Sequence, residues 1–159
     1  MQNDSAARDV VLDDGESVSV QDTHARNDAA DLVGANAAKP RPEWVPTDRI
    51  VQGWQAVTSN PRVDVVVELI GGVTDARDAV YDALNRGKAT VTANKALLAA
   101  DGVALTRLAS GKDCGLCFEA AVGGGVPVIA SVAETLNANT FQRVVGIVNG
   151  TTNFILSRM

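Results

Sequence analysis

The chain has 159 residues, of which 46% are hydrophobic but only 4% aromatic, and its formal net charge is −5. It has no basic stripe to hold nucleic acid, no basic amphipathic helix for a membrane surface, and no apolar run near the ~18 residues of a membrane span, so neither partner is expected. Scarce aromatics with abundant Ala, Val, Leu and Gly favour helix-on-sheet layers over a β-sandwich. Two cysteines and an N-terminus without a secretory pattern favour a reducing, cytoplasmic setting.

The first third of the chain is acidic and polar. Residues 1–49 hold ten acidic against five basic side chains, whereas residues 50–159 hold nine of each. Residues 1–30 are rich in Asp, Ser, Asn and Ala around one short apolar patch, Val10–Leu12, and we expect them to form a poorly ordered N-terminal extension. The alternative for "ESVSVQD" is a short strand. Leu32–Val33 is then a brief apolar stub before a proline-punctuated loop.

A regular alternation of strands and helices begins at Val63. Residues 63–70, "VDVVVELI", form a nearly continuous β-branched run, which is typical of a strand covered on both faces in a parallel sheet. After Gly71-Gly72 the pattern predicts a helix that stops at Gly87. The apolar positions of this helix recur at helical spacing and are Ala76, Ala79, Val80, Ala83 and Leu84.

The same alternation continues through the second half of the chain. We predict strands at 89–94, 114–122 and 141–148, and helical turns over 95–111 that are interrupted at Gly102. A further helix has Pro127 near its first turn. Its apolar face consists of Ile129, Val132, Ala133 and Leu136. Residues 149–159, "NGTTNFILSRM", predict a turn and a threonine-capped helix. Together these elements indicate an α/β fold with a parallel sheet.

In such a sheet, ligands bind beyond the carboxyl ends of the strands. Four stretches follow predicted strands and should gather at one edge, namely Gly71-Gly72, "TANK" (92–95), "EAAVGGG" (119–125) and "NGTT" (149–152). Lys95 is the sharpest candidate, because a lysine there can bring a cation or a proton to a bound carbonyl, carboxylate or phosphate. The plain alternative is a solvated lysine at a helix start, although the helix dipole disfavours a cation there.

Two further features lie within or directly after the predicted third strand. Gly123–Gly125 allows either a close backbone approach to a ligand or a tight turn, but it is not a G-x-G-x-x-G motif, because the sixth position is Val128. Glu119 lies within the strand predicted over 114–122, where a carboxylate must be paired, protonated or bound to a cation. Carbonyl groups of the glycine turn could share such a cation, and a lysine or backbone N–H partner is the alternative.

Cys114 and Cys117 form a C-x-x-C pattern. In thioredoxin-like sites the motif follows a strand and opens a helix, whereas here it enters a strand. Zinc would need two more ligands, and the one histidine, His24, lies in the acidic first part of the chain. We therefore expect two small core residues rather than a redox or metal site. A Ser-His-Asp triad would depend on the same His24 and is set aside.

Four sequence stretches, in this order, resemble homoserine dehydrogenases: "VDVVVELIGG", "GKATVTANKALLAADG", "FEAAVGGGVPVI" and "VVGIVNGTTNFILSRM". They cover about residues 63–159, and a looser similarity reaches back through "LVGANAAKPRP" to residue 32. The resemblance implies an incomplete Rossmann-type parallel sheet that leads into the start of an α/β catalytic domain. Residues 31–122 would form the partial NAD(P)-binding domain, and residues 123–159 would begin the catalytic domain, which carries substrate-binding and dimerisation regions.

The resemblance also implies an activity and its residues. Such enzymes are homodimers that reduce aspartate semialdehyde to homoserine with NADPH or NADH, on the route to threonine, methionine and isoleucine. The cofactor side would comprise Gly71, Gly72, Thr92, Asn94 and Lys95, with Lys95 also catalytic. The substrate side would comprise Gly150, Thr151 and Thr152. A structural monovalent cation, sodium, would bind Glu119 and the backbone carbonyls of Val122, Gly124 and Val126.

This chain departs from the family pattern in two places. Residues 1–30 contain no G-x-G-x-x-G turn, and the family continues well past "GTTN". We therefore expect a truncated piece that is inactive alone and whose sheet lacks a central strand. The alternative is a non-catalytic module that pairs with another polypeptide through its exposed sheet edge. Lys39 and Arg41 give a slight lean towards NADP.

Overall fold

The computed structural model describes residues 9–13, 32–35, 48, 50–146 and 150–159. The strands are β1 (Asp9–Asp13), β2 (Leu32–Ala35), β3 (Ile50–Gln52), β4 (Val65–Leu69), β5 (Ala89–Thr92) and β6 (Leu116–Cys117). The α-helices are α1 (Gln55–Thr58), α2 (Asp75–Asn85), α3 (Lys95–Gly111), α4 (Val128–Ala130) and α5 (Gly150–Arg158). A 3₁₀ turn, η2 (Glu119–Ala121), follows β6, and a π-helical turn, η3 (Ser131–Thr135), continues α4.

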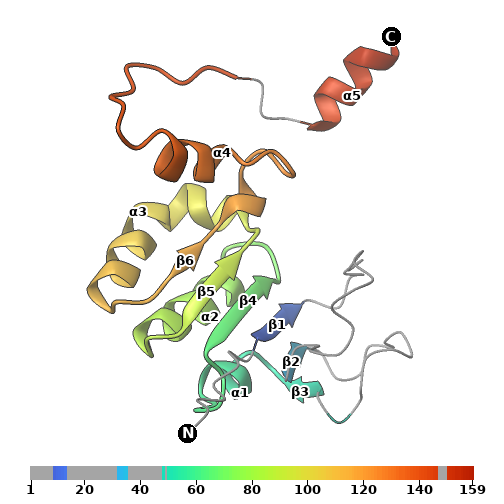
Figure 1. Cartoon of the computed structure of the whole chain (residues 1–159). Helices are drawn as coiled ribbons and strands as arrows, with labels where there is room; N and C mark the ends of the chain where they lie inside the picture. The colour runs from blue at the N-terminus through green and yellow to red at the C-terminus, as the bar shows by residue number, and fades with distance from the viewer. Residues whose placement is uncertain (1–8, 14–31, 36–47, 49, 147–149) are drawn as a thin grey trace, which may run out of the picture.

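The strands form one six-stranded parallel sheet in the order β3-β2-β1-β4-β5-β6 (Figure 1). This is the order of a doubly wound Rossmann-type sheet, in which the strand order reverses between β1 and β4. Ligands of such sheets bind at this reversal, outside the carboxyl ends of the strands. The predicted α/β fold with a Rossmann-type parallel sheet is confirmed.

β1 corrects the expectations for the N-terminal part. Residues 1–30 were expected to form a poorly ordered extension and the sheet to lack a central strand, but Asp9–Asp13 pairs with β2 on one side and with all of β4 on the other. Three apolar residues between aspartates are a weak strand signal on their own. Backbone pairing along both edges stabilises the strand, and pairing between distant segments does not appear in a local sequence pattern. The suggested strand at "ESVSVQD" lies outside the described residues.

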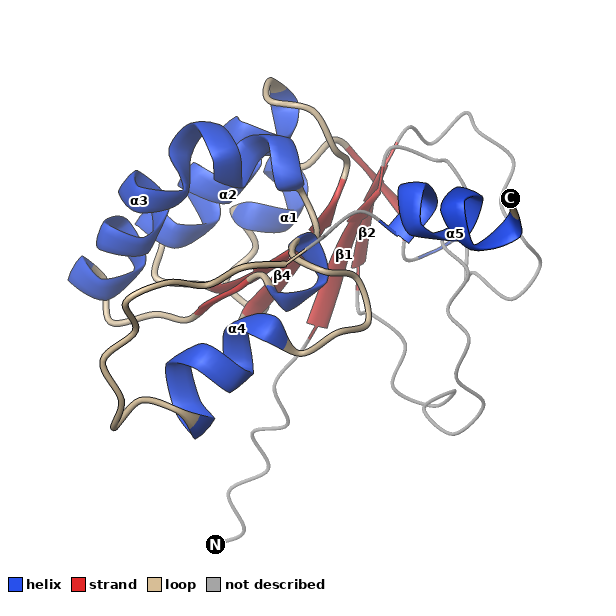
Figure 2. Ribbon diagram, turned by 90° about the horizontal axis from the view of Figure 1, so that it is seen from above, coloured by secondary structure: helices blue, strands red, loops and turns tan. Residues whose placement is uncertain are grey.

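Helices α1, α2 and α3 lie together on one side of the sheet (Figure 2). The predicted apolar face of α2 is confirmed, because Ala76, Ala79, Val80, Ala83 and Leu84 are all fully buried. This face is divided between two clusters. Ala79 and Ala83 pack with Val66 of β4 and with α1. Val80 and Leu84 pack instead with apolar side chains of α3. Helix α2 is therefore the wall that both clusters share.

Three boundaries differ from the sequence predictions. Helix α3 is continuous through Gly102, because good helix formers on both sides outweigh the roughly 1 kcal/mol that a glycine costs there. The strand predicted over 114–122 is short, since after β6 the chain turns into η2, which contains Glu119. Residues 141–146 form no strand, and Val144 and Val145 are 67% and 83% exposed. A strand needs a neighbour to pair with, and no strand of the described part pairs with this segment.

The last two helical segments of the chain, α4 with η3 and α5, are less buried than their sequence patterns predict. The face predicted for residues 129–136 runs along α4 and η3 to Leu136, the residue after η3. Ile129 and Val132 are half-buried, and Leu136 is 41% exposed. In α5 the apolar side chains of Phe154 and Leu156 are 62% and 61% exposed. Among the described helices, none is both long and apolar enough to cross a membrane.

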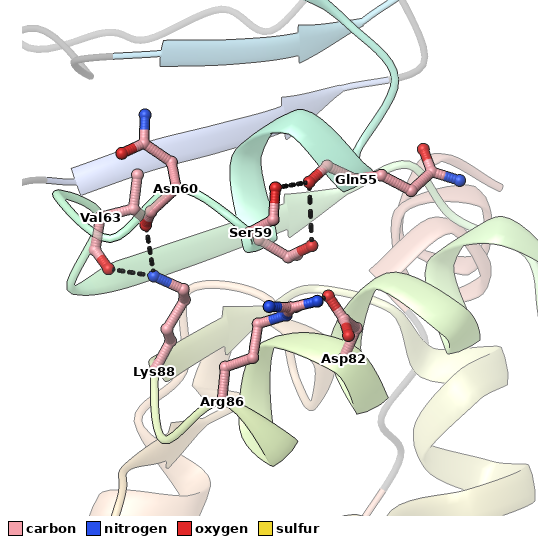
Figure 3. A network of polar contacts seen from close by, with 8 residues as sticks. Gln55, Ser59, Asn60, Val63, Asp82, Arg86 and Lys88 are labelled. Atoms are coloured by element: carbon pink, nitrogen blue, oxygen red, sulfur yellow. Dashed lines mark hydrogen bonds and ion pairs between the residues drawn. The ribbon is translucent and has the colours of Figure 1, made fainter.

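A buried lysine links two loops at the amino ends of β4 and β5, the end of the strands away from the ligand-binding edge (Figure 3). Lys88, 8% exposed, precedes β5, and its ammonium donates to the carbonyl oxygens of Asn60 at 2.7 Å and Val63 at 2.5 Å. Burial lowers the pKa of Lys88, although the nearby Asp64 carboxylate opposes this shift. The side chain thus joins the loop before β4 to the turn before β5.

Candidate active site

The carboxyl ends of β4 and β5 are joined by a buried glutamate. Glu68, in β4, is fully buried, and its carboxylate accepts two hydrogen bonds from two different segments. The backbone N–H of Gly71, just after β4, donates to Oε1 at 2.9 Å. The hydroxyl of Thr92, the last residue of β5, donates to Oε2 at 2.5 Å. One side chain therefore holds both strand ends in place.

Asn94 connects the same two segments a second time. It is the N-cap of α3, and its Oδ1 accepts from the N–H of Leu97 at 3.1 Å, as an N-cap side chain should. Its Nδ2 donates to the carbonyl oxygen of Gly72 at 2.7 Å, and its own N–H donates to the Thr92 hydroxyl oxygen at 3.0 Å. Every polar atom of the Asn94 side chain is thus engaged in fixing the loop geometry.

Gly71 and Gly72 have φ values of +79° and +71°, in the left-handed region that favours glycine. A Cβ built on either residue would meet no atom within 4 Å, so the backbone here is open to solvent or to a ligand. Lys95, the first residue of α3, is exposed and makes no ion pair within the described part of the chain. The structure therefore brings together Gly71, Gly72, Thr92, Asn94 and Lys95, as the sequence indicated.

Glu119 lies in η2, near the same end of β5 and β6, and not in a strand as predicted. Its two carboxylate oxygens accept from the backbone N–H groups of Ile129 at 2.9 Å and Ala130 at 2.8 Å. The partner is thus the backbone N–H alternative raised from the sequence, and the carboxylate satisfies donors at the start of α4 that a helix leaves free. Each oxygen keeps a lone pair, so the cation site predicted there stays a prediction.

The backbone around Glu119 bends sharply. Gly123 and Gly124 have φ values of +77° and +64°, and the Val126 carbonyl accepts from the N–H of Val128 at 2.8 Å. Within the described residues no group of three or more His, Cys, Asp or Glu side chains could hold a metal ion. A cation here would depend on Glu119 with backbone carbonyls, including that of Val122.

Gly150, Thr151 and Thr152 form the first turn of α5. The structure describes their backbone conformation, whereas their side chains lie outside the described part. Their predicted contact with substrate stays a prediction.

The two cysteines form no disulfide. Cys114 is half-buried, and its thiol donates to the carbonyl oxygen of Leu84. Burial raises the pKa of this thiol, and the Asp113 carboxylate raises it further, so the reactive thiolate is disfavoured. Cys117 is exposed, contrary to the expectation that both cysteines lie in the core.

A hollow of ≈650 Å³ lies away from this edge, beside the amino ends of β4 and β5. Arg86, Lys88 and Asp113 are among its lining residues. Lys88 is already engaged with backbone carbonyls there, and ligands of doubly wound sheets bind at the other end of the strands. The hollow is therefore not the candidate site.

Comparison with known proteins identifies the family. Residues 8–119 match the family model described as the NAD-binding domain of homoserine dehydrogenase, and residues 127–159 match the model described as homoserine dehydrogenase. The chain belongs to the homoserine dehydrogenase family. The first of these matches includes β1, which agrees with the place of Asp9–Asp13 in the sheet.

Curated homoserine dehydrogenases are close in sequence but longer. The chain is 52% identical to that of Pseudomonas aeruginosa over 103 residues, which is 65% of this chain and 24% of that protein. It is 44% identical to that of Corynebacterium glutamicum over 125 residues, covering 79% of this chain and 28% of the relative. The chain therefore spans about a quarter of the length of the curated homoserine dehydrogenases it matches.

Solved structures agree with this assignment. The homoserine dehydrogenase of Thiobacillus denitrificans superimposes with a TM-score of 0.76 at 32% identity, covering 96% of this chain and 38% of that structure. A hyperthermophilic archaeal homoserine dehydrogenase mutant in complex with NADPH superimposes with a TM-score of 0.61 at 28% identity, over 70% of this chain and 35% of that one.

Sequence reasoning on this homoserine dehydrogenase chain missed Glu68. The signal was present in "VDVVVELI", because a carboxylate within a run covered on both faces needs strong hydrogen-bond donors.

Proposed function

We propose that this chain forms the nucleotide-binding side of an enzyme that reduces aspartate semialdehyde to homoserine with NADPH or NADH. The observation that carries the proposal is the hydrogen-bonded junction of Glu68, Gly71, Thr92 and Asn94 at the carboxyl ends of β4 and β5. It lies next to the reversal between β1 and β4, where doubly wound sheets bind dinucleotides. Membership of the family supports the choice of substrate.

A nicotinamide nucleotide fits this edge on two observations. The backbone at Gly71 and Gly72 is open, so a flat ring can approach it without meeting a side chain at these positions. Lys95 supplies an exposed cation directly beside the junction. When bound, the reduced nicotinamide supplies the hydride. The chain's own residues then have to hold the ring at the ends of β4 and β5 and stabilise the negative charge that develops on the carbonyl oxygen of the substrate.

Lys95 is the group we propose for that charge. Its ammonium can donate a hydrogen bond to the carbonyl oxygen of the semialdehyde and stabilise the negative charge that develops there. It can then pass a proton from Nζ to that oxygen as the hydroxyl forms. Thr92 and Asn94 are already engaged with Glu68, Gly72 and Leu97, so we assign them to shaping the site and not to proton transfer.

The remaining site predictions belong to the same proposal. Gly150, Thr151 and Thr152 would meet the substrate, and Glu119 with the carbonyls of Val122, Gly124 and Val126 would bind a sodium ion. Homodimerisation and a cytoplasmic setting complete it. The slight lean towards NADP rests on sequence alone.

Titration of the chain with NADPH and NADH, followed by nucleotide fluorescence, tests the nucleotide half of the proposal. We expect saturable binding of at least one nucleotide, and binding of neither would overturn it. Semialdehyde-dependent loss of NADPH absorbance tests the chemical half. Because the chain alone is expected to be inactive, this rate is measured in a protein that also carries the rest of the catalytic domain, and there Lys95→Ala should lower it by about 10²–10⁴-fold, the usual contribution of a proton-transfer group. Lys112→Ala, an exposed lysine at the other end of α3, is the control and should leave the rate unchanged.

A further inference from the structure

Glu68 occupies an unusual position for a carboxylate. It lies in β4 between β1 and β5 and is 0% exposed, and Val66, two residues earlier, is equally buried. Among the described residues it forms no ion pair. A buried carboxylate is tolerated only where strong donors replace water, so its presence at this point of the strand needs a reason.

The hydrogen bonds around Glu68 form a directed chain. The Asn94 N–H donates to the Thr92 hydroxyl oxygen, the Thr92 hydroxyl donates to Oε2, and the Gly71 N–H donates to Oε1. Glu68 is therefore the final acceptor of this chain, and it receives hydrogen bonds from the ends of both β4 and β5. A hydroxyl that accepts from an N–H group is a better donor in turn, so the members of this chain strengthen one another.

We propose that Glu68 is a positioning residue for nucleotide binding, which acts through Gly71 and Thr92 to hold the two strand-end segments at a fixed separation. The inference rests on the proposed nucleotide site, because the effect of Glu68 is expected on nucleotide affinity at that site. Gly71 and Gly72 form one side of the junction, and Thr92, Asn94 and Lys95 form the other. Without Glu68, the remaining side-chain hydrogen bond between the two sides, among the described residues, is the one from Asn94 to the Gly72 carbonyl.

A glutamine of the same shape cannot replace this function. The Gly71 N–H and the Thr92 hydroxyl both require an acceptor, and a carboxamide offers one oxygen and one donor group. In Glu68→Gln either Gly71 or Thr92 therefore loses its acceptor in a buried place. Because the side-chain volume is nearly unchanged, packing around β4 should be kept.

The experiment compares Glu68→Gln with Val66→Ala in the full chain. Val66→Ala lies on the same strand, is equally buried and opens a cavity without touching the junction. Three quantities are measured for each protein: the urea midpoint of unfolding, amide hydrogen exchange at Gly71 and Asn94 without nucleotide, and the dissociation constant of NADPH.

For Glu68→Gln we expect exchange at Gly71 or Asn94 to rise by about tenfold or more, and the NADPH dissociation constant by about tenfold, as for one lost hydrogen bond to a charged group. For Val66→Ala the midpoint should fall, while the dissociation constant stays within about twofold of the wild type, since uncoupled sites act independently. If the NADPH dissociation constant changed in proportion to the loss of stability in both variants, the positioning function would be overturned. Unchanged exchange at both amides in Glu68→Gln would overturn it too.

Thr92 provides a second route if Glu68→Gln folds poorly. Thr92→Val keeps the shape and removes the hydroxyl, so it should raise exchange at Asn94, and Thr92→Ser should restore it. Because Thr92 and Glu68 share one bond, the effects in the double variant should be less than additive. Additive effects would contradict the inference. If the wild-type chain binds no nucleotide, the proposed function fails, whereas the exchange measurements still decide whether Glu68 couples the two segments.

Discussion

The Lys88 ammonium donates to the Val63 carbonyl oxygen at 2.5 Å, which links the turn before β5 to the loop before β4. Its second partner is the Asn60 carbonyl at 2.7 Å. We expect Lys88→Met to lower the free energy of unfolding by about 1–3 kcal/mol, because the buried Val63 carbonyl loses its donor and the Asn60 carbonyl keeps, within the described residues, only the Val63 N–H, at 3.2 Å. Lys112→Met replaces an exposed lysine and should change stability little. Urea unfolding measures both, and equal stability of the two variants would contradict the prediction.

Asp82 on α2 gives a prediction for acid. Burial alone would raise the pKa of this carboxyl, but hydrogen bonds from Arg86 and Thr58 and the charges of Arg86 and Lys88 lower it overall from the ordinary 3.8. Since the folded-state pKa is the lower one, the stabilisation is present above about pH 4 and disappears as the pH falls through the folded-state value. Asp82 and Arg86 are 30% and 46% exposed, so the effect is small.

Asp82→Asn should therefore lower the free energy of unfolding by about 0.2–1 kcal/mol at pH 7, and the difference should vanish in strong acid. Urea unfolding of both proteins from pH 7 to pH 2 measures it. Added salt should shrink the difference at pH 7, because exposed ion pairs are screened. A difference that persists undiminished at pH 2 would show that the carboxylate charge is not its cause.

Gly123 should not tolerate a side chain. Its φ is +77°, and a Cβ there would lie 3.2 Å from Cγ2 of Val128. We expect Gly123→Ala to weaken the turn before α4 by about 1–3 kcal/mol. Amide exchange at Ile129 and Ala130, which donate to Glu119, should rise accordingly. Gly125→Ala is the control, since a Cβ at Gly125 meets nothing within 4 Å and its φ is not in the left-handed region. Equal exchange in the two variants would contradict the prediction.

Asn94 combines two functions that substitution can separate. Asn94→Ala removes both the cap of α3 and the bond to Gly72, and should lower stability by about 0.5–2 kcal/mol. Asn94→Asp keeps an acceptor for the Leu97 N–H and adds a charge that suits a helix N-terminus, but a carboxylate cannot donate to the Gly72 carbonyl. Thermal unfolding should place Asn94→Asp above Asn94→Ala. The opposite order would contradict the prediction and would mean that repulsion between the new carboxylate and the Gly72 carbonyl outweighs the cap.

The regular centre of the fold is well determined by local sequence patterns. The apolar positions of α2 repeat at helical spacing, and all five predicted residues from Ala76 to Leu84 are buried. The β-branched run from Val65 likewise forms β4. In both cases the residues that set the local conformation are the residues that pack, so one pattern carries both kinds of information.

The predictions that failed depend on partners distant in sequence. Val10–Leu12 becomes a central strand because β2 and β4 pair with it, whereas the equally apolar Val144 and Val145 have no strand beside them in the described part. The candidate site divides in the same way. The place of the glycines and Lys95 after strands predicts them as site residues from sequence alone, whereas Glu68 stands out only because Thr92 and Gly71 converge on it in the folded chain.

Helix α2 has a consequence for how the chain unfolds. Ala79 and Val80 are adjacent in sequence, yet one belongs to the cluster with β4 and α1 and the other to the cluster with α3. A rotation of α2 that repacks one cluster must also disturb the other, so the two clusters should loosen together. Under denaturant the strands from β4 to β6 and the helices α1 to α3 should melt as one cooperative unit, with α2 the slowest segment to exchange its amides.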